Sequence, residues 1–177
     1  MKLALIRRQF SATGGAELYL QRLLQALVKG GHEPHLFAES WQGQLSGVQF
    51  HAVPVSGDRA QRPTRFADAV AAELAKHAFD VTFSLERTYH QDVYRAGDGV
   101  HASWLEARAR VQPALARAGT WLSPHHRYVL ATERSLFASP RLKAVICNAE
   151  LVREPVKRLP AVGIRRLTAA QHEIAEA

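Results

Sequence analysis

The alternation of strand-like and helix-like segments constrains the fold of this chain more than any other feature. Residues 2–8 have an apolar centre and run into a loop, 9–15, that carries a glycine pair. Apolar residues at helical spacing follow this loop: Leu20, Leu23, Leu24 and Leu27. Gly30 and Gly31 then stand where a helix C-cap is expected. The chain is therefore predicted to begin with a strand, a loop and a helix.

The same alternation continues as far as residue 147. Short β-prone segments lie at 34–38, 48–53, 79–85, 93–96 and 143–147. Helical patterns occupy about 64–76, 103–118 and 124–138. Because strands that alternate with helices pair in parallel through right-handed crossovers, we predict an α/β fold with a doubly wound, mostly parallel, Rossmann-like sheet over residues 1–150. Residues 151–177 are expected to form a helical tail.

Ligands of doubly wound folds bind at the carboxyl ends of the strands, which directs attention to the loops 9–15, 86–90 and 97–101. Gly14 and Gly15 lie just before the first predicted helix, where unpaired N–H groups and the helix dipole favour a phosphate. Glycines that serve only a tight turn would give the same pattern. The spaced glycines of a dinucleotide fingerprint and the lysine of a P-loop are absent from this loop, so neither a nicotinamide nor an ATP site is expected.

Asp98 is the strongest single candidate for chemistry. It stands between Gly97 and Gly99 at the end of a predicted strand, in an exposed and conformationally unusual position. Its carboxylate could accept a proton from a sugar hydroxyl or hold that hydroxyl by a hydrogen bond. A simple Asp-Gly turn is the alternative. His101 follows closely and fits a polar loop or helix-cap residue.

The chain carries a net charge of +7 with a pI near 10.1, so its surface should attract an anionic partner. No acid occurs between Glu106 and Glu133, where basic residues alternate with aromatic ones. Such a stretch suits an anionic membrane surface, although a solvated helix with a core-facing aromatic stripe would have the same composition. The candidates for acceptor or membrane binding are His101, Arg108, Arg110, Arg117, Trp121 and Arg127. No nucleic-acid-binding motif is recognisable, so nucleic acid is not expected as a partner.

Several kinds of site and location are excluded by composition. A single cysteine, Cys147, leaves no internal disulfide and no thiolate zinc site. The histidines are scattered, and the adjacent His125 and His126 point in different directions on a helix, so no metal site is expected. Apolar runs fall far short of the roughly 20 residues that cross a bilayer, and the amino terminus lacks a secretory signal. A cytoplasmic location is therefore expected.

The ordered set of segments resembles the N-terminal, acceptor-side domain of bacterial family 4 glycosyltransferases, of the lipopolysaccharide core glucosyltransferase type. The matching stretches are 2–8, GGAE at 14–17, YRAGDG at 94–99, 126–134 and AVICN at 144–148. The resemblance implies half of a GT-B fold, with Gly14 and Gly15 beside the donor diphosphate and Asp98 facing the acceptor hydroxyl. It also implies a retaining transfer from a nucleotide sugar without a metal or other cofactor. The basic and aromatic stretch 108–128 is then expected to face the inner membrane that holds a glycolipid acceptor, with the protein peripheral to it; this placement is inferred from the stretch itself and is not a motif match.

Members of this family continue into a second Rossmann-like domain that binds the nucleotide sugar, whereas this sequence stops at Ala177. The donor-binding domain is thus expected to be absent, and the chain by itself is expected to transfer no sugar at a useful rate. A rival hypothesis is a non-enzymatic Rossmann-like module that binds a phosphorylated ligand or an anionic membrane surface.

Overall fold

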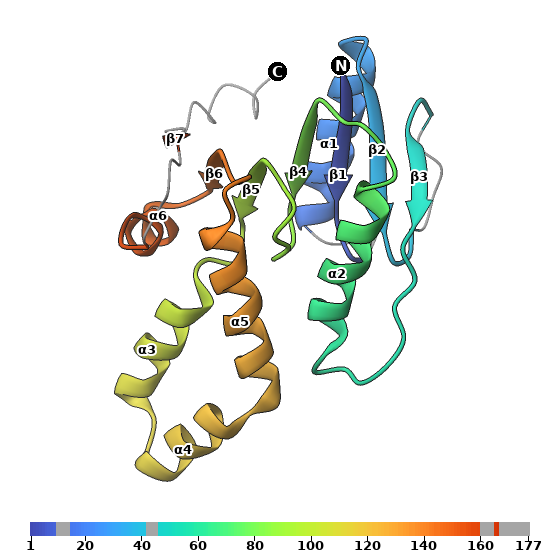
Figure 1. Ribbon diagram of the computed structural model, residues 1–177. Coiled ribbons are helices and arrows are strands. Elements are labelled where there is room, and N and C mark those ends of the chain that lie inside the picture. Colours follow the sequence, from blue (N-terminus) through green and yellow to red (C-terminus); the bar gives the residue numbers. More distant parts are fainter. Residues whose placement is uncertain (10–14, 42–45, 160–164, 167–177) are drawn as a thin grey trace.

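Seven parallel strands form one sheet in a computed structural model that describes residues 1–9, 15–41, 46–159 and 165–166 (Figure 1). The strands are β1 (Lys2–Ile6), β2 (Glu33–Ala38), β3 (Gln49–Ala52), β4 (Val81–Ser84), β5 (Val93–Ala96), β6 (Ala144–Cys147) and β7 (Arg165–Arg166). Their order is β3-β2-β1-β4-β5-β6-β7, and every pairing is parallel. The order reverses between β1 and β4, which is the switch point of a doubly wound sheet. The predicted Rossmann-like α/β fold is confirmed.

Helices cover both faces of this sheet. They are α1 (Gly15–Lys29), α2 (Arg62–Leu74), α3 (His101–Val111), α4 (Ala114–Leu122), α5 (Pro124–Ala138) and α6 (Glu150–Lys157). Leu5 of β1 packs with Leu20 and Leu24 of α1. Its neighbour Ile6 packs with Phe66 of α2 on the opposite face, as the two-residue period of a strand requires. The core of the first half therefore lies in two layers, one on each side of β1.

A third apolar cluster holds the second half of the sheet. Tyr94 of β5 and Val145 of β6 are buried against Leu136 and Phe137 of α5. Helices α3 and α4 contribute no buried residue, and together with α5 they extend beyond the carboxyl ends of the strands (Figure 1). The result is a helical projection beside the edge of the sheet where ligands of this fold class bind.

The structure differs from the sequence prediction at the segment 103–118. One helix was expected there, but α3 ends at Val111 and α4 begins at Ala114. Gln112 is extended, with φ −90° and ψ 142°, because the ring of Pro113 disfavours the helical conformation in the residue before it. Pro113 also lacks the N–H that would continue the helix.

The segment 151–177 is partly helical. Helix α6 ends at Lys157, and residues 165–166 form β7, whose backbone extends the sheet from the edge of β6. A strand at this place differs from the predicted tail helix, because the open edge of β6 offers backbone groups for pairing. Residues 167–177 lie outside the described part of the chain.

Candidate functional site

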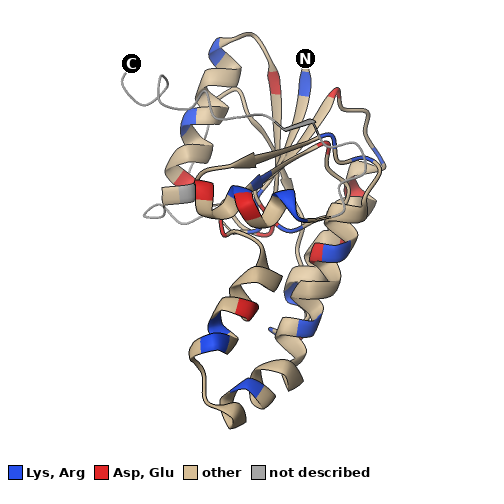
Figure 2. Cartoon of the chain, turned by 90° about the vertical axis from the view of Figure 1, so that its left-hand side faces the viewer, with Lys and Arg blue, Asp and Glu red and all other residues tan. Residues whose placement is uncertain are grey.

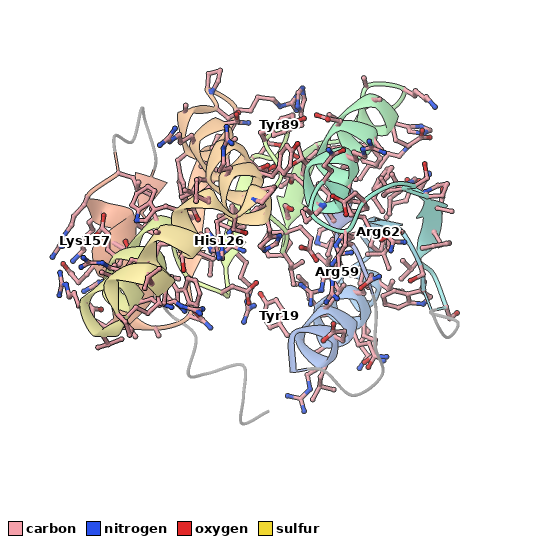
Figure 3. The ribbon with its side chains drawn as sticks, turned by 90° about the horizontal axis from the view of Figure 1, so that it is seen from below. Tyr19, Arg59, Arg62, Tyr89, His126 and Lys157 are labelled. Atoms are coloured by element: carbon pink, nitrogen blue, oxygen red, sulfur yellow. The ribbon has the colours of Figure 1, made fainter. Side chains whose placement is uncertain are left out.

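A cavity of about 230 Å³ opens at the carboxyl edge of the sheet. Figure 3 looks onto this edge, with Tyr19 of α1, Arg62 of α2 and His126 of α5 around it. The lining residues come from the loops after β1, β4 and β5 and from α2, α3 and α5: Arg8, Pro63, Phe66, Glu86, Arg87, Asp98, His101, His125, Val129 and Thr132. Two of the three loops that the sequence singled out, 86–90 and 97–101, thus contribute to one cavity.

Asp98 lies at the mouth of this cavity, directly after β5. Its side chain is 80% exposed, and its Oδ2 is 3.8 Å from Nη1 of Arg87. Gly99 adopts a φ of +73°, a left-handed conformation that strains any residue with a side chain. The turn therefore presents the carboxylate of Asp98 to solvent beside one guanidinium group.

Arg87 holds the Asp98 loop in place from the neighbouring strand end. Its Nη2 donates to the carbonyl oxygen of Gly99 at 3.1 Å, and its Nε donates to Glu133 of α5 at 3.3 Å. The Glu133 carboxylate also accepts the backbone N–H groups of His101 at 2.7 Å and Ala102 at 3.1 Å. Helix α3 has no cap from its own sequence, so a buried acid of α5 caps it.

A second set of ion pairs connects the end of β1 to α1 and to the loop after β4. Arg7 lies 3.0 Å from Glu17 in the first turn of α1 and 3.1 Å from Glu86. Burial raises the pKa of Glu86, against the opposing effect of Arg7. Burial works to lower the pKa of Arg7, but the carboxylates of Glu86 and Glu17 outweigh it and raise that pKa. Arg7 therefore stays charged and ties three elements together.

Glu39, after β2, completes this ring of charges. Its side chain is 7% exposed and lies between two guanidinium groups. Arg8 reaches it at 3.4 Å, and Nε of Arg62, at the start of α2, donates to it at 2.8 Å. The acids and bases at this edge are thus largely paired with one another, which fixes the geometry of the cavity wall.

Gly15 begins α1, and a Cβ placed on it would meet no atom within 4 Å. The start of this helix is therefore open on the side of Gly15. Gly14 lies outside the described residues. Their proposed part in phosphate binding stays a prediction.

The candidate residues for acceptor or membrane binding lie in three places: this cavity, a second cavity and the exposed surface of α3. The second cavity, of about 310 Å³, lies among α3, α4 and α5 and is lined in part by Arg117, Trp121 and Arg127. His101 lines the first cavity instead. Arg110 is exposed at the end of α3.

Helices α3 and α4 carry an exposed surface that is both basic and apolar, which we call the α3–α4 surface. Arg108 lies 4.9 Å above the ring of Trp104. The same two helices expose large apolar side chains: Trp104, Val111, Leu115, Trp121 and Leu122. Figure 2 shows the arginines of these helices in blue, with one acidic position among them on α3. Trp121 is 69% exposed, so the alternative of a core-facing aromatic stripe is wrong for α4. Among the described residues, no helix has the length and apolar character to cross a bilayer.

Two histidines join the two cavities. Nε2 of His101 lies 3.1 Å from Nδ1 of His126, and His101 stacks on Trp104. Burial, aided by Arg87, lowers the pKa of His101. Burial also lowers the pKa of His126. A pair of neutral rings, with one hydrogen between them, fits this environment.

The sequence analysis did not select Arg87 and Glu133, which organise the site. Glu133 had a detectable signal, because it lies on the same face of α5 as the buried Val129 and Leu136. A charged residue on the apolar face of a helix indicates a buried partner. Arg87 had no such signal, since its partner is 46 positions away.

The doubly wound sheet and the charged cavity at its carboxyl edge define a Rossmann-like ligand-binding domain. Residues 13–165 match the profile of Glycosyltransferase Family 4, so the chain belongs to this family. No curated protein sequence matches it significantly.

Solved structures of two transferases share the fold. One is WaaG, a glycosyltransferase involved in lipopolysaccharide biosynthesis, with a TM-score of 0.77 and 21% identity over 93% of this chain. The other is sucrose-phosphate synthase from Thermosynechococcus elongatus, with a TM-score of 0.57 and 13% identity over 95% of this chain. The chain spans 44% and 48% of these proteins, less than half of each. Its fold is that of one Rossmann-like half of a GT-B glycosyltransferase.

Proposed function

We propose that this chain is the acceptor-binding half of a retaining, nucleotide-sugar-dependent glycosyltransferase that acts in lipopolysaccharide core or related glycolipid assembly. Membership of Glycosyltransferase Family 4 and the fold shared with WaaG support the class. The observation that carries the proposal is the exposed carboxylate of Asp98 at the mouth of the cavity, held beside Arg87.

Asp98 would act on the acceptor hydroxyl. A sugar hydroxyl that enters the cavity can donate its hydrogen to Oδ1 or Oδ2, which orients the oxygen toward the donor or takes up its proton. Arg87 and Glu133 would act through position, because they hold the turn that presents Asp98. No nucleophilic side chain is required, since the acceptor oxygen itself attacks the sugar.

The donor diphosphate would lie near the start of α1, beside Gly14 and Gly15, where N–H groups favour an anion. The arginines that line the cavity, Arg8 and Arg87, are already paired with Glu39 and Glu133 in the described part of the chain. The positive groups that stabilise the leaving diphosphate would therefore come mainly from a second domain, with no metal or other cofactor. We infer that the isolated 177-residue chain transfers no sugar at a useful rate.

The α3–α4 surface would place the enzyme on the anionic cytoplasmic face of the inner membrane, as a peripheral protein. Exposed arginines can meet lipid phosphates while Trp121 and its apolar neighbours enter the headgroup region. The second cavity opens among the same helices, and we infer that the acceptor lipid approaches from there.

Binding of a lipopolysaccharide-core acceptor tests the proposal. Saturable binding by the wild-type chain is expected, and Asp98→Asn should weaken it about tenfold, because a hydrogen bond to a charged carboxylate is replaced by a weaker one to a neutral amide oxygen. Asp68→Asn, an exposed acid of α2 away from the cavity, is the matched control and should bind as the wild type does. Equal affinity for both variants would contradict the role of Asp98. Binding that follows anionic charge alone, and vanishes with salt, would favour the non-enzymatic module instead.

A further inference from the structure

A cluster of potential metal ligands lies away from the cavity, where β3 meets the end of α2. One donor atom each from His51, Glu73 and His77 falls within 4.8 Å of the other two. Glu73 lies in the last turn of α2 and His77 lies just beyond the end of this helix; their side chains approach to 4.0 Å, and His51 faces them from the edge strand β3. Sequence spacing alone could not join residue 51 to 73 and 77.

Hydrogen bonds fix which nitrogen of His51 is free. Nε2 of the buried His35 lies 3.0 Å from the Glu33 carboxylate, which can only accept, so this nitrogen carries hydrogen. In neutral His35 the other nitrogen, Nδ1, then accepts, and it lies 2.8 Å from Nε2 of His51. His51 therefore donates from Nε2 and keeps a lone pair on Nδ1. A metal-bound imidazole usually donates its other N–H to an acceptor behind it, and here His35, oriented by Glu33, is that acceptor.

The other two ligands, Glu73 of α2 and His77 beyond its end, are also suitably arranged. Lys76 engages Oε2 of Glu73 at 2.6 Å, while Oε1 of the same carboxylate lies 4.0 Å from Nε2 of His77. The exposed His77 and the half-buried Glu73 can rotate inward to reach an ion. Ligand atoms on tetrahedral zinc are about 3.3 Å apart, given bonds of about 2.0 Å, so the cluster has to contract only modestly.

We propose that His51, Glu73 and His77 bind a divalent transition-metal ion such as Zn²⁺, with water in the fourth position. Two imidazoles and one carboxylate are a ligand set that zinc accepts. The ion would fasten β3, at the edge of the sheet, to the end of α2. Arg62, at the other end of α2, lies about 17 Å away along the helix axis, so the ion would stabilise the fold and take no part in sugar transfer.

Competition with a chromophoric chelator for Zn²⁺ tests the site on the full 177-residue chain. About one equivalent should bind, and His77→Ala and Glu73→Gln should each weaken binding by about tenfold or more. Both changes are at accessible positions that leave the core intact. Lys76→Ala should bind Zn²⁺ more tightly, because a competing positive charge is removed from Glu73.

His126→Ala is the matched control, since it removes a histidine from the other histidine pair. It should bind Zn²⁺ as the wild type does. In a second measurement, excess Zn²⁺ should raise the melting temperature of the wild type more than that of His77→Ala, because the ion binds the folded state. Absence of wild-type binding, unchanged affinity in His77→Ala and Glu73→Gln, or loss of binding in His126→Ala would overturn the proposal.

Discussion

Glu133 is the residue on which the geometry of the candidate site most depends. Its carboxylate is 5% exposed, and it receives two backbone N–H groups of α3 together with Nε of Arg87. One buried acid thus sets the start of a helix and the position of the Asp98 loop.

Glu133→Gln should lower the free energy of unfolding by about 2–3 kcal/mol, because hydrogen bonds to a buried charge are worth more than those to an amide. The amide NH₂ would also face N–H donors. Urea denaturation measures the loss, and Glu106→Gln, an exposed acid of α3, is the matched control. If the two variants were equally stable, the hydrogen bonds of Glu133 to α3 and Arg87 would not contribute to stability as proposed.

The histidine pair predicts a pH dependence of stability. Folding lowers the pKa of His101 and His126 below the ordinary value of 6.5, so the unfolded chain binds more protons in the window just below that value. Their contribution to stability is present above pH 6.5 and is lost as the pH falls through the lowered pKa.

Denaturation at a series of pH values from about 7.5 to about 5 tests this dependence. In the double variant His101→Asn with His126→Asn, the free energy of unfolding should decrease less toward acidic pH than in the wild type. The difference between the two slopes of unfolding free energy against pH reports the histidine pair alone. Glu86 contributes equally to both curves, and its raised pKa makes stability fall as the pH rises. Parallel curves for wild type and variant would show that the pair is not responsible.

For single residues, the sequence predicted where a residue lies in the fold better than which side chains it contacts. Glycines on both sides marked Asp98 as an exposed turn residue, and it lies in such a turn. The contacts of Arg87 and Glu133 depend on three segments meeting in space, and no local pattern records that.

At the scale of elements, most helices and strands follow from apolar periodicity. The predicted strand 93–96 and helix 124–138 agree with β5 and α5. The break between α3 and α4 falls at Pro113, inside the segment 103–118 for which a helix was expected. That break lets α4 turn away from the sheet and expose its own apolar residues.

The α3–α4 surface should bind vesicles that contain anionic lipids. Exchange of Leu115 and Trp121 for serine should weaken binding about tenfold or more, since both side chains would otherwise be removed from water on the membrane. They are 90% and 69% exposed in the free chain, so its stability should not change. Co-sedimentation with vesicles measures the effect.

Leu18→Ser changes an exposed apolar residue of α1 and is the control for nonspecific hydrophobic binding to vesicles. It should bind vesicles as the wild type does. If it were as weak as the double variant, or if neutral vesicles bound equally well, the α3–α4 surface would lose its assigned role.

For the whole molecule, the class of sheet could be predicted but its strand order could not. Alternating elements require a parallel sheet with helices on both faces. The reversal that places β4 beside β1 depends on which edge each crossover returns to, and it brings the loops after β4 and β5 to one cavity. The ion pairs around that cavity join residues from different strand ends, so they could not be predicted without the strand order.

The charge balance of that edge also limits what the isolated chain can do. Transfer of a sugar leaves a diphosphate, whose negative charge must be stabilised as it develops. Arg7, Arg8, Arg62 and Arg87 each have a carboxylate partner in the described part of the chain. Recruiting Arg7 or Arg87 would leave a carboxylate without its cation near the departing phosphate, and recruiting Arg8 or Arg62 would remove one of the two guanidinium groups beside Glu39. In each case the loss of an existing ion pair offsets part of the stabilisation of the phosphate.

We therefore expect the 177-residue chain to bind acceptor but to show no turnover of nucleotide sugar above that of Asp98→Asn. Release of nucleoside diphosphate in the presence of a lipopolysaccharide-core acceptor measures it. Turnover by the wild type that Asp98→Asn abolishes would contradict this expectation and would mean that one half suffices for catalysis. Acceptor binding without turnover is the result that paired arginines at the sheet edge predict, because the geometry for the acceptor is then present while the charge for the leaving group is not.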